Sequence, residues 1–157
     1  MKMLALQMEE LIEKFKNDFY NLDEEITTIK ISQDKWSIKE IIGHLIDSTS
    51  NNHQRFVRMK ISEEISFPDY NNEEWLKAQH HQNMKFNELM NLFYFFNKLL
   101  IGIIEEVDDN QLTHKWKVTW FENKDFITLE ELMIHYVDHL KGHYHHMHER
   151  LNELTNL

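Results

Sequence analysis

Apolar residues recur along this chain at intervals of three and four rather than two, which is the spacing of amphipathic helices. Residues that interrupt helices are scarce, with three glycines and one proline. The sequence shows no internal repeat and no low-complexity segment. We therefore predict an all-α fold, a four-helix bundle in a single domain that covers residues 1–157.

The helix boundaries follow from this pattern and from local capping signals. We predict helices over residues 4–29, 36–60 and 84–106, and a fourth that starts at Thr128. Ser37 with Glu40, and Thr128 with Glu131, have the spacing of a capping box, in which two side chains bond the free backbone N–H groups of a helix start. These two starts are the most firmly marked in the chain.

Two segments between the helices have a different character. A polar linker around Pro68 separates the second helix from the third. Residues 115–129 alternate large and polar side chains, which predicts a short hairpin or an extended crossover. Trp116 and Trp120 in this segment could line a pocket, although capping one end of the core is the more common role of such residues.

The third helix is apolar on more than one side. Its main stripe consists of Leu89, Leu92, Phe93, Phe96, Leu100, Ile103, Ile104 and Val107. Outside it lie Tyr94, Phe95, Leu99 and Ile101. A helix of this kind is either central or part of a subunit interface, and an exposed apolar patch would favour a homodimer.

Composition narrows the classes of function. The formal net charge is -10, from 27 acidic and 17 basic residues, which disfavours binding to nucleic acid and to anionic membranes. The absence of cysteine excludes disulfides, thiolate zinc sites and a cysteine nucleophile. The N-terminus lacks a signal-peptide pattern, and the most apolar stretch, residues 92–104, is too short to span a bilayer. We expect a cytoplasmic protein that acts on a small molecule.

Histidine is the unusual component of the composition. Six of the 11 histidines lie within residues 135–148. On a helix, His135, His139, His143 and His146 share one face, and histidines four residues apart can chelate one ion. The pairs 135/139 and 139/143 both have this spacing, so spacing alone leaves the choice open. A catalytic site needs a third ligand, and His44, beside the apolar face of the second helix, is the best candidate.

Other residues near these histidines are candidates for acid–base roles. Asp47, three residues after His44, could orient an imidazole or a bound water, or could be a plain exposed carboxylate. Tyr136 and His146 are the remaining candidates for a catalytic base. The chain contains no H-E-x-x-H and no G-x-S-x-G, which excludes zincin-type proteases and nucleophile-elbow hydrolases.

Two segments resemble a known family. DKWSIKEIIGHLIDS (34–48) and HYVDHLKGHYHHMHERL (135–151) are similar to the signatures of the DinB-like four-helix proteins, and within them of the YfiT-type metal-dependent enzymes. The resemblance implies a bundle with long crossover connections and the metal ligands His44, His139 and His143, with His146 as a neighbour. The chain departs from the subfamily at Asp138 and Gly142.

The resemblance also implies an activity. It points to a transferase that uses a low-molecular-weight thiol such as bacillithiol to attack a small electrophile. Our hypothesis is that the metal binds the thiol as a thiolate, and that Trp116, Trp120 and the mouth of the bundle receive the electrophile. The alternatives are a hydrolase in which the metal activates water, and a non-catalytic metal-binding or stress-response protein in which His135 or His146 closes the site as a fourth ligand. We expect one divalent ion, zinc or nickel, with iron, cobalt or manganese as alternatives.

Overall fold

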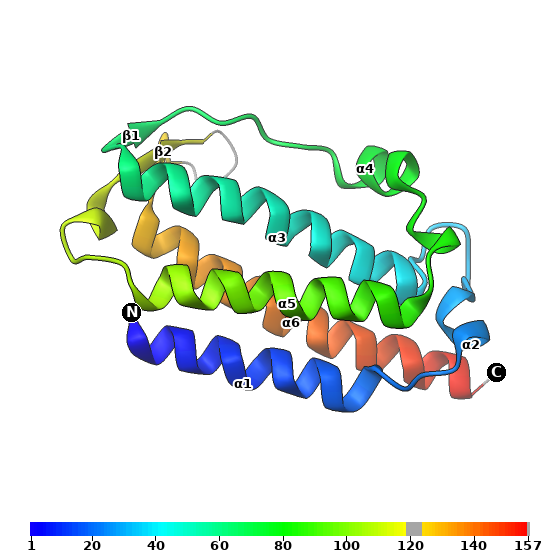
Figure 1. Cartoon of the computed structure of the whole chain (residues 1–157). Coiled ribbons are helices and arrows are strands. Elements are labelled where there is room, and N and C mark those ends of the chain that lie inside the picture. The colour runs from blue at the N-terminus through cyan, green and yellow to red at the C-terminus, as the bar shows by residue number, and fades with distance from the viewer. Residues whose placement is uncertain (119–123, 157) are drawn as a thin grey trace.

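Four long helices form a bundle in the computed structural model, which describes residues 1–118 and 124–156 (Figure 1). The helices are α1 (Lys2–Phe19), α3 (Ile38–Ile61), α5 (Phe86–Glu105) and α6 (Leu129–Thr155). In Figure 1, α3 and α5 run in one direction while α1 and α6 run in the other. The predicted all-α class and four-helix bundle are confirmed.

Both predicted capping boxes are present. Ser37 Oγ accepts the backbone N–H of Glu40 at 3.1 Å, and the Glu40 carboxylate accepts the backbone N–H of Ser37 at 2.8 Å. Thr128 and Glu131 make the same reciprocal pair at 3.2 and 2.9 Å. These bonds fix where α3 and α6 begin, because they satisfy N–H groups that have no partner within the helix.

The predicted helix over residues 4–29 is wrong, because the structure divides it. Helix α1 ends at Phe19, and a separate short helix, α2, covers Glu24–Thr28. The side chain of Asp23 accepts the backbone N–H of Glu25 at 2.8 Å, which makes Asp23 the N-cap of a new helix. The first helix is therefore shorter than predicted, and a new helix starts within the predicted range.

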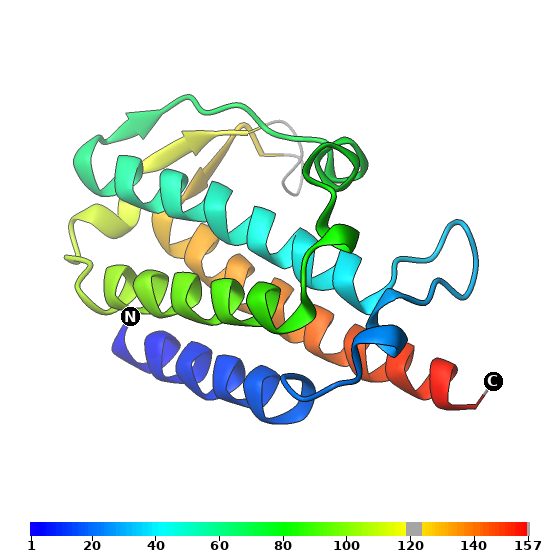
Figure 2. The same cartoon turned by 45° about the vertical axis from the view of Figure 1, so that its right-hand side comes forward.

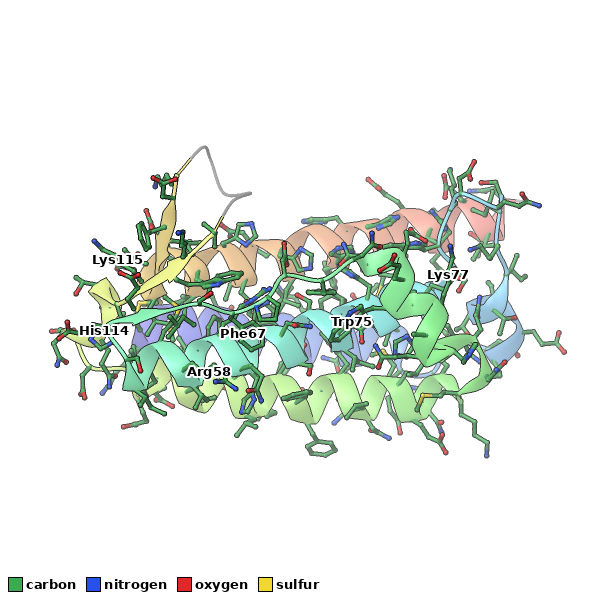
Figure 3. All side chains as sticks on the ribbon, turned by 90° about the horizontal axis from the view of Figure 1, so that it is seen from above. Arg58, Phe67, Trp75, Lys77, His114 and Lys115 are labelled. Atoms are coloured by element: carbon green, nitrogen blue, oxygen red, sulfur yellow. The ribbon has the colours of Figure 1, made fainter. Side chains whose placement is uncertain are left out.

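The connection from α3 to α5 is a long crossover, because these two helices run in the same direction (Figures 1 and 2). It contains β1 (Glu64–Ile65), α4 (Asn72–Gln79) and the 3-10 turn η1 (His81–Asn83). Viewed from above, its extended part lies over α3, with Phe67 near the middle and Trp75 on α4 (Figure 3). The crossover therefore covers the side of the bundle on which α3 faces α6.

A small sheet lies at the end of the bundle where α3 ends and α6 begins. After the 3-10 turn η2 (Gln111–Thr113), β2 (Lys115–Lys117) pairs antiparallel with β3 (Phe126–Thr128) and parallel with β1. Of the two predicted alternatives, a hairpin or an extended crossover, the antiparallel pairing supports the hairpin, while residues 119–123 between the strands lie outside the described residues. Trp116 on β2 is buried within the hydrophobic core, whereas Trp120 lies outside the described residues.

The core lies among the four long helices: α3 packs against α5 and α6, and α1 packs against the same two helices. The stripe predicted on α5 needs two corrections, since Leu92 is exposed and Ile101 is buried. Phe95 and Leu99 are also exposed, and the predicted homodimer stays a prediction. Within residues 1–118 and 124–156, no helix combines the length and the apolar character that a bilayer span requires.

Candidate metal centre

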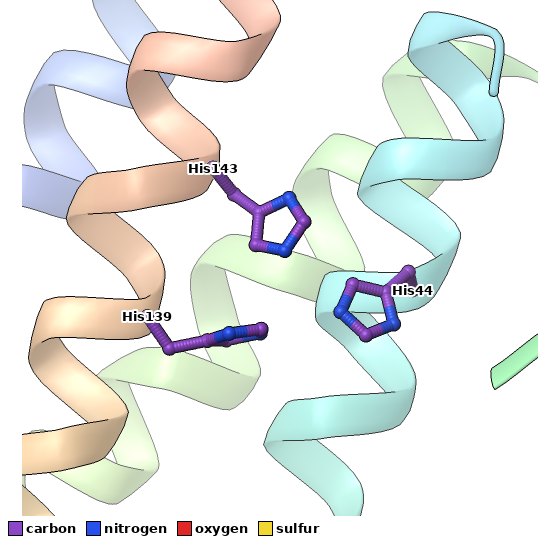
Figure 4. A group of neighbouring side chains, drawn as sticks. All are labelled: His44, His139 and His143. Atoms are coloured by element: carbon purple, nitrogen blue, oxygen red, sulfur yellow. The ribbon is translucent and has the colours of Figure 1, made fainter. Parts of the chain in front are cut away.

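Three histidines meet where α3 faces α6. His44 projects from α3, and His139 and His143 project from successive turns of α6 (Figure 4). One potential ligand atom from each histidine lies within 4.8 Å of those of the other two. The ring centroids are 5.2 Å apart for His44 and His139, 4.8 Å for His44 and His143, and 4.6 Å for His139 and His143. We call these three residues the histidine cluster.

Neighbouring residues hold the cluster in place. The indole of Trp36 packs on the ring of His44 with centroids 5.0 Å apart, and its Nε1–H donates to Glu73 at 2.9 Å. Arg150, near the end of α6, donates to the backbone carbonyl of Trp36. The residues just before α3 are thus tied to α6, the helix that carries the other two histidines.

Each histidine of the cluster keeps a buried nitrogen without a hydrogen-bond partner in the described part of the chain. These atoms are His44 Nδ1, His139 Nε2 and His143 Nδ1. A buried polar atom without a partner costs free energy, and none of the three rings satisfies both of its nitrogens within the described residues. Because each ring offers one nitrogen within 4.8 Å of those of the other two, the three together fit a divalent metal ion with positions left for other ligands.

The protonation state of the cluster also suits a cation. Burial, reinforced by the neighbouring imidazoles, lowers the pKa of His44 and of His143 to about 3. The same causes lower the pKa of His139 to about 4. The three rings are therefore neutral at pH 7, which is the form that binds metals.

The two other histidines considered for the site do not join the cluster. In the described residues, the group with metal-binding geometry contains neither His135 nor His146. His135 is exposed, and the ring centroid of His146 lies 5.8 Å from that of His143. Burial lowers the pKa of His146. The role of His146 as a catalytic base stays a prediction.

Asp47 is buried on α3, where Gln79 of α4 donates to its Oδ1. Its Oδ1 also lies 3.9 Å from Nε2 of the buried His81. Burial raises the pKa of the Asp47 carboxyl to about 6, against the opposing effect of the Gln79 hydrogen bond. A Cβ on Gly43 would collide with the His81 ring, so Gly43 lets this histidine approach α3. The structure thus ties Asp47 to the crossover, and its catalytic role stays a prediction.

Tyr136 takes part in a buried polar network that joins three helices. Its hydroxyl donates to Asn97 Oδ1 at 2.6 Å and lies 2.8 Å from Thr49 Oγ1. The Asn97 amide donates to Thr49 Oγ1 at 3.2 Å and to the Phe93 carbonyl at 2.8 Å. Burial raises the pKa of Tyr136, so the phenol stays protonated. Its role as a catalytic group stays a prediction.

A cavity of about 200 Å³ opens beside the histidine cluster, between α3, α6 and the crossover. His44 and His139 line it, and so does the ring of Tyr136. Trp116 is absent from its lining: the indole N–H donates to the Phe67 carbonyl at 3.1 Å, and the ring packs against the guanidinium of Arg55, which does line the cavity. The cavity therefore leaves space for a small molecule beside the histidine cluster.

Sequence reasoning missed part of this cavity. Ser48, Asn52 and Arg55 of α3 line it, at positions 4, 8 and 11 residues after His44. This spacing places all of them on the helical face of His44, so the signal was present in the sequence. Asp69 and Tyr70 also line it, but they come from the crossover, whose path no local pattern reveals.

Comparisons with known proteins agree with this architecture. A solved structure described as "YfiT from Bacillus subtilis is a probable metal-dependent hydrolase with an unusual four-helix bundle topology" superimposes with a TM-score of 0.84 and 19% sequence identity, over 97% of this chain and 86% of that one. Among curated proteins, no sequence matches the chain. The sequence profile of the DinB superfamily matches residues 7–147. The chain therefore belongs to the DinB superfamily.

Proposed function

We propose that this protein is a divalent-metal-dependent enzyme that transfers a low-molecular-weight thiol, such as bacillithiol, to a small electrophile. The observation that carries the proposal is the histidine cluster, whose three potential ligand atoms lie within 4.8 Å of one another and whose His44 and His139 line a cavity large enough for a small molecule. The similarity to YfiT, whose description names metal dependence, supports the metal.

His44, His139 and His143 would hold the ion. A divalent cation at this point would supply positive charge that favours the deprotonated form of a thiol or water beside it and that polarises an electrophile. Because the three imidazoles are neutral, they leave that charge undiminished. Zinc and nickel both suit three imidazole donors, with iron, cobalt and manganese as alternatives.

The cavity lining bears on the identity of the nucleophile. Among the described residues that line it, Asp69 is the one carboxylate, and it pairs with Arg55 at 3.1 Å. The cavity therefore offers no free carboxylate in its described part to take a proton from water. A thiol is a stronger acid than water and needs less assistance, which favours thiol transfer.

The transfer step balances without an oxidant or a reductant. The thiol loses its proton, and its sulfur forms a bond to the electrophilic carbon of the substrate. The bond from that carbon to the leaving group breaks, and the leaving group departs with the electron pair. Asp47, Tyr136 and His146 are the candidates for proton transfer, and burial raises the pKa of the Asp47 carboxyl to about 6, towards neutrality.

Hydrolysis of a small ester or amide is the second candidate. It is supported by the description of YfiT as a probable metal-dependent hydrolase, since the two chains share their fold. Water is also smaller than any thiol, so a cavity of about 200 Å³ leaves more room for the substrate in a hydrolase.

One experiment separates these activities. The protein is loaded with zinc or nickel and incubated with a panel of small thiols and a chromogenic aryl halide, and thioether formation is followed by absorbance. We expect thioether formation above the uncatalysed rate for at least one thiol. It should be lost in His143→Ala and kept in the matched control His145→Ala, which removes an exposed histidine two residues away.

Two results would overturn the thiol-transfer proposal. Cleavage of nitrophenyl esters or anilides without any thiol consumption would assign the protein to the hydrolases. Stoichiometric metal binding with neither activity, and with His135 or His146 as a fourth protein ligand, would assign it to the non-catalytic metal-binding proteins.

A further inference from the structure

The cavity beside the histidine cluster has a second polar end. Along α3 its lining runs from His44 through Ser48 and Asn52 to Arg55, a length of about three helical turns. The metal-binding atoms are at the His44 end. The groups at the Arg55 end play no part in the proposed transfer step, and their chemistry indicates what else the cavity binds.

Arg55 is an unusual residue to find buried. Its exposed fraction is 4%, and its guanidinium lies 4.1 Å from the centre of the Trp116 ring. Its Nη2 donates to Asp69 Oδ1 at 3.1 Å, whereas its Nε has no hydrogen-bond partner within the described residues. The Asp69 side chain is 54% exposed, and its bond to Nη2 leaves the Nε side of the guanidinium without a partner in the described residues. A buried guanidinium with a free donor is a site for a planar anion.

One turn nearer the metal end, Asn52 offers the complementary group. Its Nδ2 donates to the Ser48 carbonyl at 2.9 Å, which leaves Oδ1 as an acceptor. That Oδ1 is buried and has no partner in the described part of the structure. Donors on Arg55 and an acceptor on Asn52 together match a carboxylate with an N–H or O–H group close to it.

We propose that the cavity binds an elongated small molecule whose carboxylate pairs with the guanidinium of Arg55, whose N–H or O–H group bonds to Asn52, and whose reacting group lies at the histidine cluster. This inference rests on the proposed function, since it places the thiol or the electrophile of that reaction. It names a substrate class: small carboxylates that carry their reactive group several bonds from the acid.

The test uses a homologous series of ω-mercaptoalkanoic acids, from two to eight carbons, each compared with its primary amide. Binding to the zinc-loaded wild-type protein is measured by isothermal titration calorimetry. We expect the acid to bind at least about tenfold more tightly than its amide at one optimal chain length, because a charge-assisted pair replaces a neutral hydrogen bond. Equal affinities of acid and amide at every length would overturn the inference.

Substitutions test whether Arg55 causes the tighter binding of acids than of amides. Arg55→Met should abolish the difference between acid and amide, and Arg55→Lys should keep part of it, because the charge remains while the two-pronged geometry is lost. The matched control Arg58→Met removes an exposed arginine one turn further along α3 and should leave the preference unchanged. The comparison of acid with amide on the wild-type protein stands even where Arg55→Met fails to fold.

The same measurements separate this inference from the proposed function. An Arg55-dependent preference for acids in a protein that transfers no thiol would support the carboxylate site and contradict thiol transfer. Thiol transfer at equal rates for acids and amides, unchanged in Arg55→Lys, would support the function and contradict the carboxylate site.

Discussion

Two polar clusters lie where α3 meets α6, one of them extending to Asn97 on α5, and they differ in how their atoms are paired. In the network of Thr49, Asn97 and Tyr136, the side-chain polar groups bond to one another or to backbone carbonyls. In the histidine cluster, each ring keeps a buried nitrogen without a partner among the described residues.

The difference separates structure from function. A fully paired buried network contributes to stability and to a unique packing arrangement. An unpaired cluster costs stability, and it is retained where a ligand completes it. We therefore propose that the network serves the fold and that the histidine cluster binds a metal ion, and the predictions below test that division.

The largest expected effect is the loss of metal from a histidine variant. His44→Ala removes one of three donors, and affinity should fall by more than about 100-fold, beyond the usual cost of losing a residue that only supports a ligand. Elemental analysis after gel filtration measures the retained metal. His145→Ala should keep a full complement, and full retention by His44→Ala would remove His44 from the site.

A substitution in the network should instead lower stability and leave metal binding unchanged. Tyr136→Phe deletes a hydroxyl bonded to Asn97 and Thr49, and should lower the free energy of unfolding by about 1–3 kcal/mol, because it leaves buried polar groups unpaired. Urea denaturation measures this change. Metal stoichiometry should be unaltered, and a loss of metal without a loss of stability would contradict the assignment of Tyr136 to the fold.

Lowering the pH should reduce the free energy of unfolding through the histidine cluster and not through the network of Thr49, Asn97 and Tyr136. The folded-state pKa values of the three histidines, about 3 to 4, lie below the unfolded value of 6.5, so the unfolded chain binds more protons in this window. The free energy of unfolding of the metal-free protein should therefore fall as the pH drops from 6.5 towards 4. Each imidazole contributes up to about 1.4 kcal/mol per pH unit.

Variants locate this pH dependence. His139→Gln should make the slope shallower by up to about 1.4 kcal/mol per pH unit, whereas Tyr136→Phe should lower stability equally at each pH. Denaturation curves recorded between pH 4 and pH 7 measure both slopes. Parallel slopes in the wild type and His139→Gln would show that this imidazole does not titrate as its burial requires.

The smallest expected effect is the change in stability on substituting Gly142, the residue before His143. A Cβ there meets nothing within 4 Å, so Gly142→Ala should raise the free energy of unfolding by about 0.5–1 kcal/mol through helix propensity alone. Thermal denaturation detects the change. Metal affinity should stay the same, which would show that stability and metal binding vary independently on α6.

The parts of the fold predicted from sequence are those governed by local rules. The starts of α3 and α6 were predictable because a capping box lies within four residues of sequence. The split between α1 and α2 does not follow from the apolar pattern, which continues past the N-cap at Asp23. Helix α4 was also missed, because its eight residues bury one apolar side chain, Leu76, and show little periodicity.

The candidate site, too, was predictable only where local spacing determines it. Spacing on α6 identified the histidines but left two overlapping pairs open, because helical periodicity shows which residues share a face and not what that face meets. His135 is exposed in the structure, whereas His139 and His143 meet His44. Contacts such as Arg55 with Asp69 depend on the path of the crossover, which tertiary packing determines.

The central claim is that His44, His139 and His143 bind one divalent ion and leave positions open for substrate. X-ray absorption spectroscopy of the zinc-loaded wild-type protein tests it most directly. The account predicts three imidazole nitrogens at about 2.0–2.1 Å with the remaining positions filled by light atoms that do not belong to histidine. A fourth imidazole, or a spectrum unchanged in His139→Ala, would contradict it.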